Sequence, residues 1–289
     1  MPTIGEACAF ADGPAVAPIT LGQRRRAGEL GWEFTSLDAS LDPGRQAQQV
    51  DELVARGVDG LTTWTLDAGL AEPAYRRAVA AGIPIVAFNS ESPSVTTVVR
   101  QRADSEAPAE DAARYIAERV ENARVLVVGG PPIPALVART ERFLEAAGRA
   151  GLTVVGRDDN VGDVEETAVP LVEALLEQQP NVDAVWCFND YTAVAAGKVL
   201  RRRGAPIWSG RGRGVIVSGI SGAPLAIQAI RDGSVTLTYD SLPVDAGRAA
   251  IDVLEAILVR GEEPPPEVWV DTVRYDASNI DSFVPWEER

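Results

Sequence analysis

Short apolar runs alternate with longer amphipathic stretches along the chain, and this alternation restricts the fold more than any other feature. Apolar runs of this kind are typical of parallel strands that are covered on both faces. The intervening stretches have the spacing of helices that pack on such a sheet. In the first part of the chain, strands are expected at residues 4–10, 33–37, 60–64 and 83–88, and helices at 46–56 and 70–81.

The alternation starts again near residue 125, which predicts a second sheet. Similar segments in the two halves, such as Leu30-Gly31-Trp32 and Ala150-Gly151-Leu152, indicate two related lobes rather than a solenoid of small repeats. A chain of 289 residues is long enough for two α/β lobes, each with its own core. In this half, strands are expected at residues 125–128, 152–155, 184–188 and 215–217, and helices at 137–150, 165–179, 191–203 and 224–232.

The C-terminal part adds a predicted strand at residues 235–239, a long helix at 244–260 and a strand at 268–273. A helix that follows a completed second lobe needs a surface to pack on, and we expect it to return to the first lobe. Repeated crossings create a hinge with a cleft, where the carboxyl ends of the strands face each other. The predicted N-terminal lobe is residues 1–101 plus 240–263, and the C-terminal lobe is residues 102–239 plus 264–289.

The chain contains no histidine, which removes the commonest general base and the commonest zinc ligand. Carboxylates that are neighbours in sequence point in different directions, and no calcium-loop spacing is present. We therefore expect neither an enzyme nor a bound metal or cofactor. A formal charge of −15 argues against nucleic acid as a partner, because phosphate backbones are bound by clustered Lys and Arg.

No apolar run approaches the roughly 20 residues that a membrane-spanning helix needs, so the chain is not expected to span a membrane. Residues 1–10 contain neither a basic leader nor the apolar core of a secretion signal. Either such a signal has been removed from this sequence, or the protein is cytoplasmic. Cys8 and Cys187 lie in apolar runs and are interpreted as buried thiols, not as a disulfide framework.

The residues that follow the predicted strands are rich in amide, hydroxyl and carboxylate groups. In open α/β sheets, ligands bind beyond the carboxyl ends of the strands. Such groups suit a neutral polyhydroxylated ligand, and aromatic rings can stack on a sugar ring. Each residue could also be an ordinary turn or cap residue, and their shared position is what favours binding. The candidate ligand-binding residues are Phe10, Asp12, Trp64, Asn89, Ser90, Arg139, Asn189, Ser221, Asp240 and Ser241.

The segment Gly129-Gly130-Pro131-Pro132 follows a predicted strand and superficially resembles a phosphate loop. It has neither of the usual phosphate-loop patterns, and proline removes the N–H donors that would hold a phosphate. A tight strand-to-helix turn is the better interpretation.

Four segments, at residues 53–61, 80–89, 180–190 and 229–233, occur in an order and spacing that resemble a known family. The most specific are Gly-Ile-Pro-Ile-Val at 82–86 and Pro-Asn-Val-Asp-Ala-Val-Trp-Cys-Phe-Asn-Asp at 180–190. They resemble the type 1 periplasmic-binding-protein superfamily, and most closely its ribose-binding group. The resemblance implies two Rossmann-like lobes with parallel sheets flanked by helices. It also implies a hinge of three crossings that closes on a ligand.

The same resemblance gives meaning to individual positions. Arg139 and Asn189 stand where the family places a sugar-binding arginine and asparagine. Asn89, Ser90, Ser221 and Ser241 stand where an aspartate, an arginine, an aspartate and a glutamine are usual, and Ala15 and Val16 replace a pair of stacking aromatic rings. A different sugar, a polyol or another small polar molecule is therefore expected rather than ribose, with Trp64 as a replacement stacking surface.

Three hypotheses about function follow. The first is a periplasmic or extracellular solute-binding protein for carbohydrate transport, a monomer that docks on the permease of an ABC transporter. The alternative is the effector-binding core of a sugar-responsive transcription regulator that lacks its DNA-binding domain, although a first strand starting at residue 3 or 4 leaves no room for one. The third is an enzyme on the same scaffold with Asp12, Asp190 or Asp240 as its base.

Overall fold

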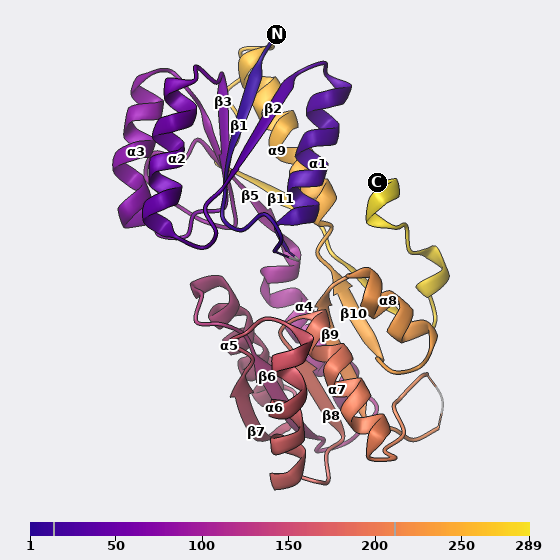
Figure 1. The fold of residues 1–289 in the computed structure, drawn as a ribbon. Helices are drawn as coiled ribbons and strands as arrows, with labels where there is room; N and C mark the ends of the chain where they lie inside the picture. The colour runs from indigo at the N-terminus through magenta and orange to yellow at the C-terminus, as the bar shows by residue number, and fades with distance from the viewer. Residues whose placement is uncertain (14, 211) are drawn as a thin grey trace. The chain divides into compact units, whose positions relative to one another are not determined.

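The computed structural model describes residues 1–289 apart from residues 14 and 211, and it divides into two compact units (Figure 1). Each unit contains a six-stranded sheet covered by helices on both faces. The predicted α/β architecture of two parallel sheets is thereby confirmed. The first unit is Met1–Gln101, Leu242–Val270 and Trp286–Arg289, and the second unit is Arg102–Ser241 and Asp271–Pro285.

The sheet of the first unit is entirely parallel, with strand order β11-β5-β4-β3-β1-β2. Its central strands are buried along their whole length, as expected for apolar runs without alternation. The strands are β1 (Thr3–Cys8), β2 (Glu33–Asp38), β3 (Gly60–Thr63), β4 (Ile85–Phe88), β5 (Thr97–Gln101) and β11 (Glu267–Val270).

Two pairs of helices cover this sheet, one pair on each face. Helices α1 (Ala17–Glu29) and α9 (Pro243–Leu258) pack together on one face, and α2 (Pro43–Ala55) and α3 (Ala68–Ala80) on the other. Helices α1 and α9 come close because glycines meet backbone at their interface. A Cβ on Gly22 would lie 2.0 Å from the carbonyl oxygen of Val244, so only glycine permits this packing.

The sheet of the second unit has strand order β12-β10-β9-β8-β6-β7, and only its edge strand β12 runs antiparallel. Between β10 and its antiparallel partner β12, the chain passes through the first unit as α9 and β11. The strands are β6 (Arg124–Gly129), β7 (Thr153–Asp159), β8 (Ala184–Cys187), β9 (Ile216–Ser221), β10 (Leu237–Asp240) and β12 (Val273–Asp276).

The side chains of β6 alternate between the two hydrophobic cores of the second unit, one on each face of the sheet. Val125 and Val127 join the cluster under α4 (Glu106–Ala117) and α5 (Pro134–Arg149), while Leu126 and Val128 face the opposite cluster. The opposite face is covered by α6 (Glu165–Gln178), α7 (Asp190–Arg202) and α8 (Pro224–Arg231). None of the helices in the described part of the chain is long and apolar enough to cross a membrane.

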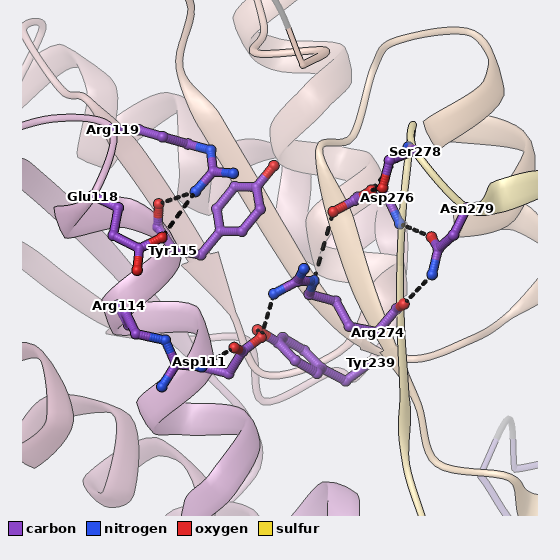
Figure 2. A network of polar contacts seen from close by, with 10 residues as sticks. All are labelled: Asp111, Arg114, Tyr115, Glu118, Arg119, Tyr239, Arg274, Asp276, Ser278 and Asn279. Carbon is purple, nitrogen blue, oxygen red and sulfur yellow. Dashed lines mark hydrogen bonds and ion pairs between the residues drawn. The ribbon is translucent and has the colours of Figure 1, made fainter.

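A polar network connects the edge strand β12 with α4 and β10 of the same unit, as Figure 2 shows. The Asp111 carboxylate on α4 accepts hydrogen bonds from the Tyr239 hydroxyl (2.8 Å) and from Arg274 on β12 (2.7 Å). Burial acts to raise the pKa of Asp111, but these two donors and the Arg114 guanidinium outweigh it and lower that pKa below its ordinary value. The network therefore links α4, β10 and β12 through one ionised carboxylate.

The tail departs from the sequence-based expectation. The single strand expected at residues 268–273 is wrong, because the chain turns at residues 271–272 and forms β11 in one sheet and β12 in the other. Residues 264–270 and 286–289 lie with the first unit although they were expected in the second, and residues 240–241 with the second although they were expected in the first. Strand β11 pairs with β5, and Arg25 of α1 donates to the carbonyl oxygens of Trp286 and Glu287.

The chain consequently changes unit between residues 101 and 102, 241 and 242, and 270 and 271, and once more at 285–286. The sequence analysis expected three passages, at residues 101–102, 239–240 and 263–264, whereas the structure has four, and the fourth brings the last residues back to α1.

Candidate functional site

The parallel strands bring the predicted polar residues to the carboxyl rim of the sheet in each unit. In the first unit they come after β1, β3 and β4, and in the second unit they come from α5 and from the ends of β8, β9 and β10. The first rim carries Phe10, Asp12, Trp64, Asn89 and Ser90, and the second rim carries Arg139, Asn189, Ser221, Asp240 and Ser241.

Asn89 is fixed by the neighbouring strand. Its side-chain amide donates to the Oε1 of Gln101 (2.9 Å), and its Oδ1 accepts from the Gln101 backbone N–H (2.9 Å). Asn89 has a φ of 48°, a left-handed conformation that asparagine tolerates better than most residues. One N–H of the half-buried amide remains for another acceptor.

Trp64 follows β3 and Ser90 follows β4, and a hydrogen bond joins their two loops. The buried Gln46 on α2 donates to the Trp64 carbonyl oxygen (2.9 Å) and accepts from the Leu66 N–H (2.9 Å). The Ser90 hydroxyl oxygen accepts from the Thr65 N–H (3.0 Å). The Trp64 ring is half-buried against the cluster formed by α1 and α9, so part of its surface stays open for stacking.

The loop after β1 carries the remaining residues of the first rim. Phe10 is half-buried and its carbonyl oxygen accepts from the Gly13 N–H (3.0 Å), whereas Asp12 is exposed. Asp38 at the end of β2 anchors this loop by accepting from the Ala11 N–H (3.1 Å). Burial acts to raise the Asp38 pKa, but hydrogen bonds from Ser40 and Ala11 outweigh it and lower that pKa.

Arg139 lies half-buried on α5 and is held by two partners. Its Nε and Nη2 donate to the Asp104 carboxylate, with an Nε–Oδ1 distance of 2.8 Å, and its Nη1 donates to the carbonyl oxygen of Phe188 (2.7 Å). A guanidinium has five N–H groups, and these three bonds leave two of them for a ligand. The ion pair therefore positions the guanidinium without using all its donors.

Asn189 serves two partners within the same rim. Its Oδ1 accepts from the Thr192 N–H (2.9 Å) and caps the N-terminus of α7, while its Nδ2 donates to Asp163 (2.5 Å). Burial raises the pKa of Asp163 to about 6, against the opposing effects of Arg139 and the Asn189 hydrogen bond. The structure thus brings together Arg139, Asn189 and a carboxylate that the sequence analysis did not select.

Ser221, Asp240 and Ser241 form a second group on this rim. Ser221 ends β9 with a φ of 138°, and its carbonyl oxygen accepts from the Ser241 N–H (3.2 Å). Asp240 is fully buried, and Gly222 (φ 73°) packs directly on it. A Cβ at position 222 would lie only 2.4 Å from the Asp240 Cγ. Asp240 is therefore out of reach of solvent, whereas Ser221, its register partner on β9, and Ser241 are half-buried.

Asp190 is a structural carboxyl behind the rim. It is fully buried, accepting from the Thr238 hydroxyl (2.6 Å) and from the Ala223 N–H (2.7 Å), and it thereby connects α7 with the loop after β9. Burial raises its pKa to about 7, and the Asp240 carboxylate adds to this rise. Its burial and its two partners argue against the role of catalytic base considered in the sequence analysis.

The Gly129-Gly130 segment serves close packing. A Cβ on Gly129 would lie 2.1 Å from the Asp159 Oδ1, and one on Gly130 would lie 2.4 Å from the Phe188 ring. Helix α5 begins at Pro134 directly afterwards. This geometry is that of the tight strand-to-helix turn predicted from the sequence.

Two acidic residues of the site were missed in the sequence analysis. Asp104 follows β5, for which the sequence predicts no strand, so its place after a strand is not visible in the sequence. Asp163 comes four residues after the end of β7, too far from the strand to be selected by reading the residues directly after it. Asn160, which directly follows β7, is buried and donates to the Thr192 hydroxyl (2.9 Å).

In the chain as described, no three Cys, Asp or Glu side chains are grouped so that they could hold a metal ion.

Comparison with known proteins places the chain in a family. The family model described as periplasmic binding protein domain matches residues 13–263. The ribose import binding protein of Bacillus subtilis is 27% identical over 263 residues, which cover 89% of this chain and 81% of the relative. Its counterpart from Salmonella typhimurium is 25% identical over 272 residues, covering 93% and 88% of the two chains.

The fold agrees with that of a solved structure. A periplasmic solute-binding protein of an ABC transporter from Actinobacillus succinogenes, solved with bound D-allose, superposes with a TM-score of 0.86 at 21% identity, covering 98% of this chain and 100% of that one. The protein, with its two sheets of mostly parallel strands and polar strand-end rims, therefore belongs to the periplasmic binding protein family, with the type 1 fold expected from its sequence.

Proposed function

We propose that the protein is the solute-binding component of an ABC transporter and captures a sugar or a sugar-like polar molecule. The observation that carries the proposal is the cluster of Arg139, Asn189 and Asp163, in which donors and an acceptor lie together at the end of a parallel sheet. Relatives named as ribose import binding proteins support the same function.

The chemistry of this cluster suits hydroxyl groups. Arg139 keeps two N–H donors after its bonds to Asp104 and Phe188, and Asn189 keeps one after its bond to Asp163. A ligand hydroxyl both donates and accepts, so it can pair with a carboxylate and a guanidinium at once. A phosphate or a carboxylate would instead meet Asp163, and the two negative charges would repel each other.

The mechanism that we propose is capture by closure. The chain passes between its two units at residues 101–102, 241–242 and 270–271, and a rotation at these passages would let both rims contribute to one ligand. The ligand-bound form would then dock on the permease of the transporter. We further propose a periplasmic or extracellular location, a monomeric state and binding without chemical turnover.

The proposal is tested by thermal shift and isothermal titration with a panel of pentoses, hexoses, inositols and linear polyols. We expect at least one compound to raise the melting temperature and to bind with 1:1 stoichiometry. Small-angle scattering should then show a smaller radius of gyration in its presence. Failure of every compound to bind, or release of a chemically altered sugar after incubation, would overturn the proposal.

A further inference from the structure

We propose that Asp163 determines specificity by accepting a hydrogen bond from one hydroxyl of the ligand. This inference rests on the proposed function and makes it more specific, because it states what the ligand must present at the second rim. The required group is a neutral hydrogen-bond donor such as a hydroxyl, and a fluorine, a methyl ether or a carboxylate would not replace it.

The backbone holds Asp163 at the site in an uncommon conformation. Its φ is 57°, a left-handed value that aspartate tolerates better than most residues, and its N–H donates to the Asn160 carbonyl oxygen (3.2 Å). This turn lies between β7 and α6. It places the carboxyl group 2.5 Å from the amide nitrogen of Asn189, which follows a different strand. The side chain is thus aimed at the rim residues.

One oxygen of the Asp163 carboxyl group remains available. Asn189 donates to Oδ1, and no other residue in the described part of the chain donates to Oδ2. Asp163 is half-buried, and this partial burial raises its pKa to about 6. The free oxygen still lies at the surface of the rim, where a ligand hydroxyl can donate to it in place of water.

Asp163 does not serve as an ordinary structural aspartate. The residue that caps α6 is Val164, which provides no side-chain cap, and the capping group of α7 is Asn189. Arg139 is bonded to Asp104 and to Phe188, and it acts on Asp163 only through its charge. Among the residues that the structure describes, the carboxyl group therefore caps no helix and has no direct ion pair.

The experiment is a chemical double-mutant cycle with the sugar or polyol identified in the panel. Asp163→Asn and Asp163→Ala are each titrated with the parent compound and with its monodeoxy and monodeoxyfluoro analogues, one for each hydroxyl. For one hydroxyl position we expect wild type to lose roughly 10- to 100-fold in affinity with the deoxyfluoro analogue, the range for a hydrogen bond to a charged group. For Asp163→Ala the same analogue should bind as well as the parent.

Asp158→Asn is the matched control, because it removes an exposed carboxylate of β7 whose side chain accepts only from the N–H of Asp159 among described residues. Its affinity should stay within twofold of wild type. Melting temperatures of all variants separate binding effects from unfolding. The inference is overturned if wild type and Asp163→Ala lose the same factor with every analogue. A panel with no binder at all refutes the proposed function itself, so the two failures remain distinguishable.

Discussion

Asp104 accepts hydrogen bonds from both Nε and Nη2 of Arg139 through one oxygen, Oδ1. Both side chains are mostly buried, with 12% of the arginine and 15% of the aspartate side chain exposed. Asp104 lies in the short helix of residues 102–104 that begins the second unit, so the group that orients Arg139 sits where the chain enters that unit. Position and orientation of the guanidinium thus depend on a residue that need not touch the ligand.

Substitution Asp104→Ala should reduce sugar affinity about tenfold or more, because the Arg139 guanidinium loses the partner that orients it. The free energy of unfolding should fall by about 2 kcal/mol, since a mostly buried charge loses its partner. Titration calorimetry and urea unfolding measure the two effects.

The control is Glu110→Ala, which removes an exposed ion pair between Glu110 on α4 and Arg149 on α5 (3.0 Å). An exposed pair of this kind contributes between about 0 and 1 kcal/mol, so this variant should bind like wild type. Equal affinities of Asp104→Ala and wild type would show that Asp104 does not position Arg139.

Two substitutions of Asn189 should separate its role as the cap of α7 from its role as the hydrogen-bond donor to Asp163. Asn189→Ser keeps a side-chain oxygen that can cap α7 but removes the amide that donates to Asp163. We expect its stability to stay within about 0.5 kcal/mol of wild type while its sugar affinity falls. Asn189→Ala should lose about 1 kcal/mol of stability in addition. If Asn189→Ser binds sugar as tightly as wild type, Asn189 is only a helix cap.

The architecture was predictable because the apolar runs that form buried parallel strands differ from helical spacing along the whole chain. Strands such as β8 and β4 lie within one residue or two of the expected ranges. The tail was not predictable, because a four-residue strand carries no signal for the sheet edge on which it pairs. Thus β11 and β12 appeared as one strand, although they belong to different sheets.

The site was predictable only in part. Reading the residues after each strand selects Asn89 and Asn189, and the structure supplies their partners Gln101 and Asp163. Those partners come from a strand that was not delimited and from a turn four residues past a strand end. The burial of Asp240 could not be predicted from the sequence either, because it depends on how Gly222 packs against the Asp240 side chain.

The stability of the protein should depend on pH through Asp190. Its pKa is raised from an ordinary value of 3.8 to about 7, so the folded protein binds the proton more tightly than the unfolded chain does. Linkage then requires that its contribution to the free energy of unfolding decreases as pH rises from about 4 to about 7 and is constant above that range. The limiting slope for one proton is about 1.4 kcal/mol per pH unit.

Asp190→Asn should remove this part of the pH dependence. The Asp190 carboxyl group accepts from the Thr238 hydroxyl and from the Ala223 N–H. An amide of nearly the same size retains an acceptor oxygen and has no proton that titrates in this range. Urea unfolding of both proteins at pH 5, 6, 7 and 8 gives the comparison. The free energy of unfolding of the variant should rise relative to that of wild type as the pH increases from 5 to 7. A difference that is constant across this range would show that Asp190 does not titrate there.

Gly222 should tolerate alanine much less well than a glycine with the same backbone angle elsewhere in the same unit. Gly222 and Gly204 both have a φ of 73°, but a Cβ on Gly222 would lie 2.4 Å from the Asp240 Cγ, whereas a Cβ on Gly204 meets no atom within 4 Å. Gly204→Ala therefore reports the left-handed backbone alone, which costs roughly 1 kcal/mol.

Gly222→Ala adds the displacement of the buried Asp240 side chain and should cost at least about 2 kcal/mol more in the free energy of unfolding. Because Asp240 is paired with Ser221 on the neighbouring strand and directly precedes Ser241, the variant should also bind sugar more weakly under conditions where it remains folded. Urea unfolding of the two alanine variants measures the difference directly. Equal losses of stability would mean that the rim yields to the added methyl group and that Asp240 is not fixed by Gly222.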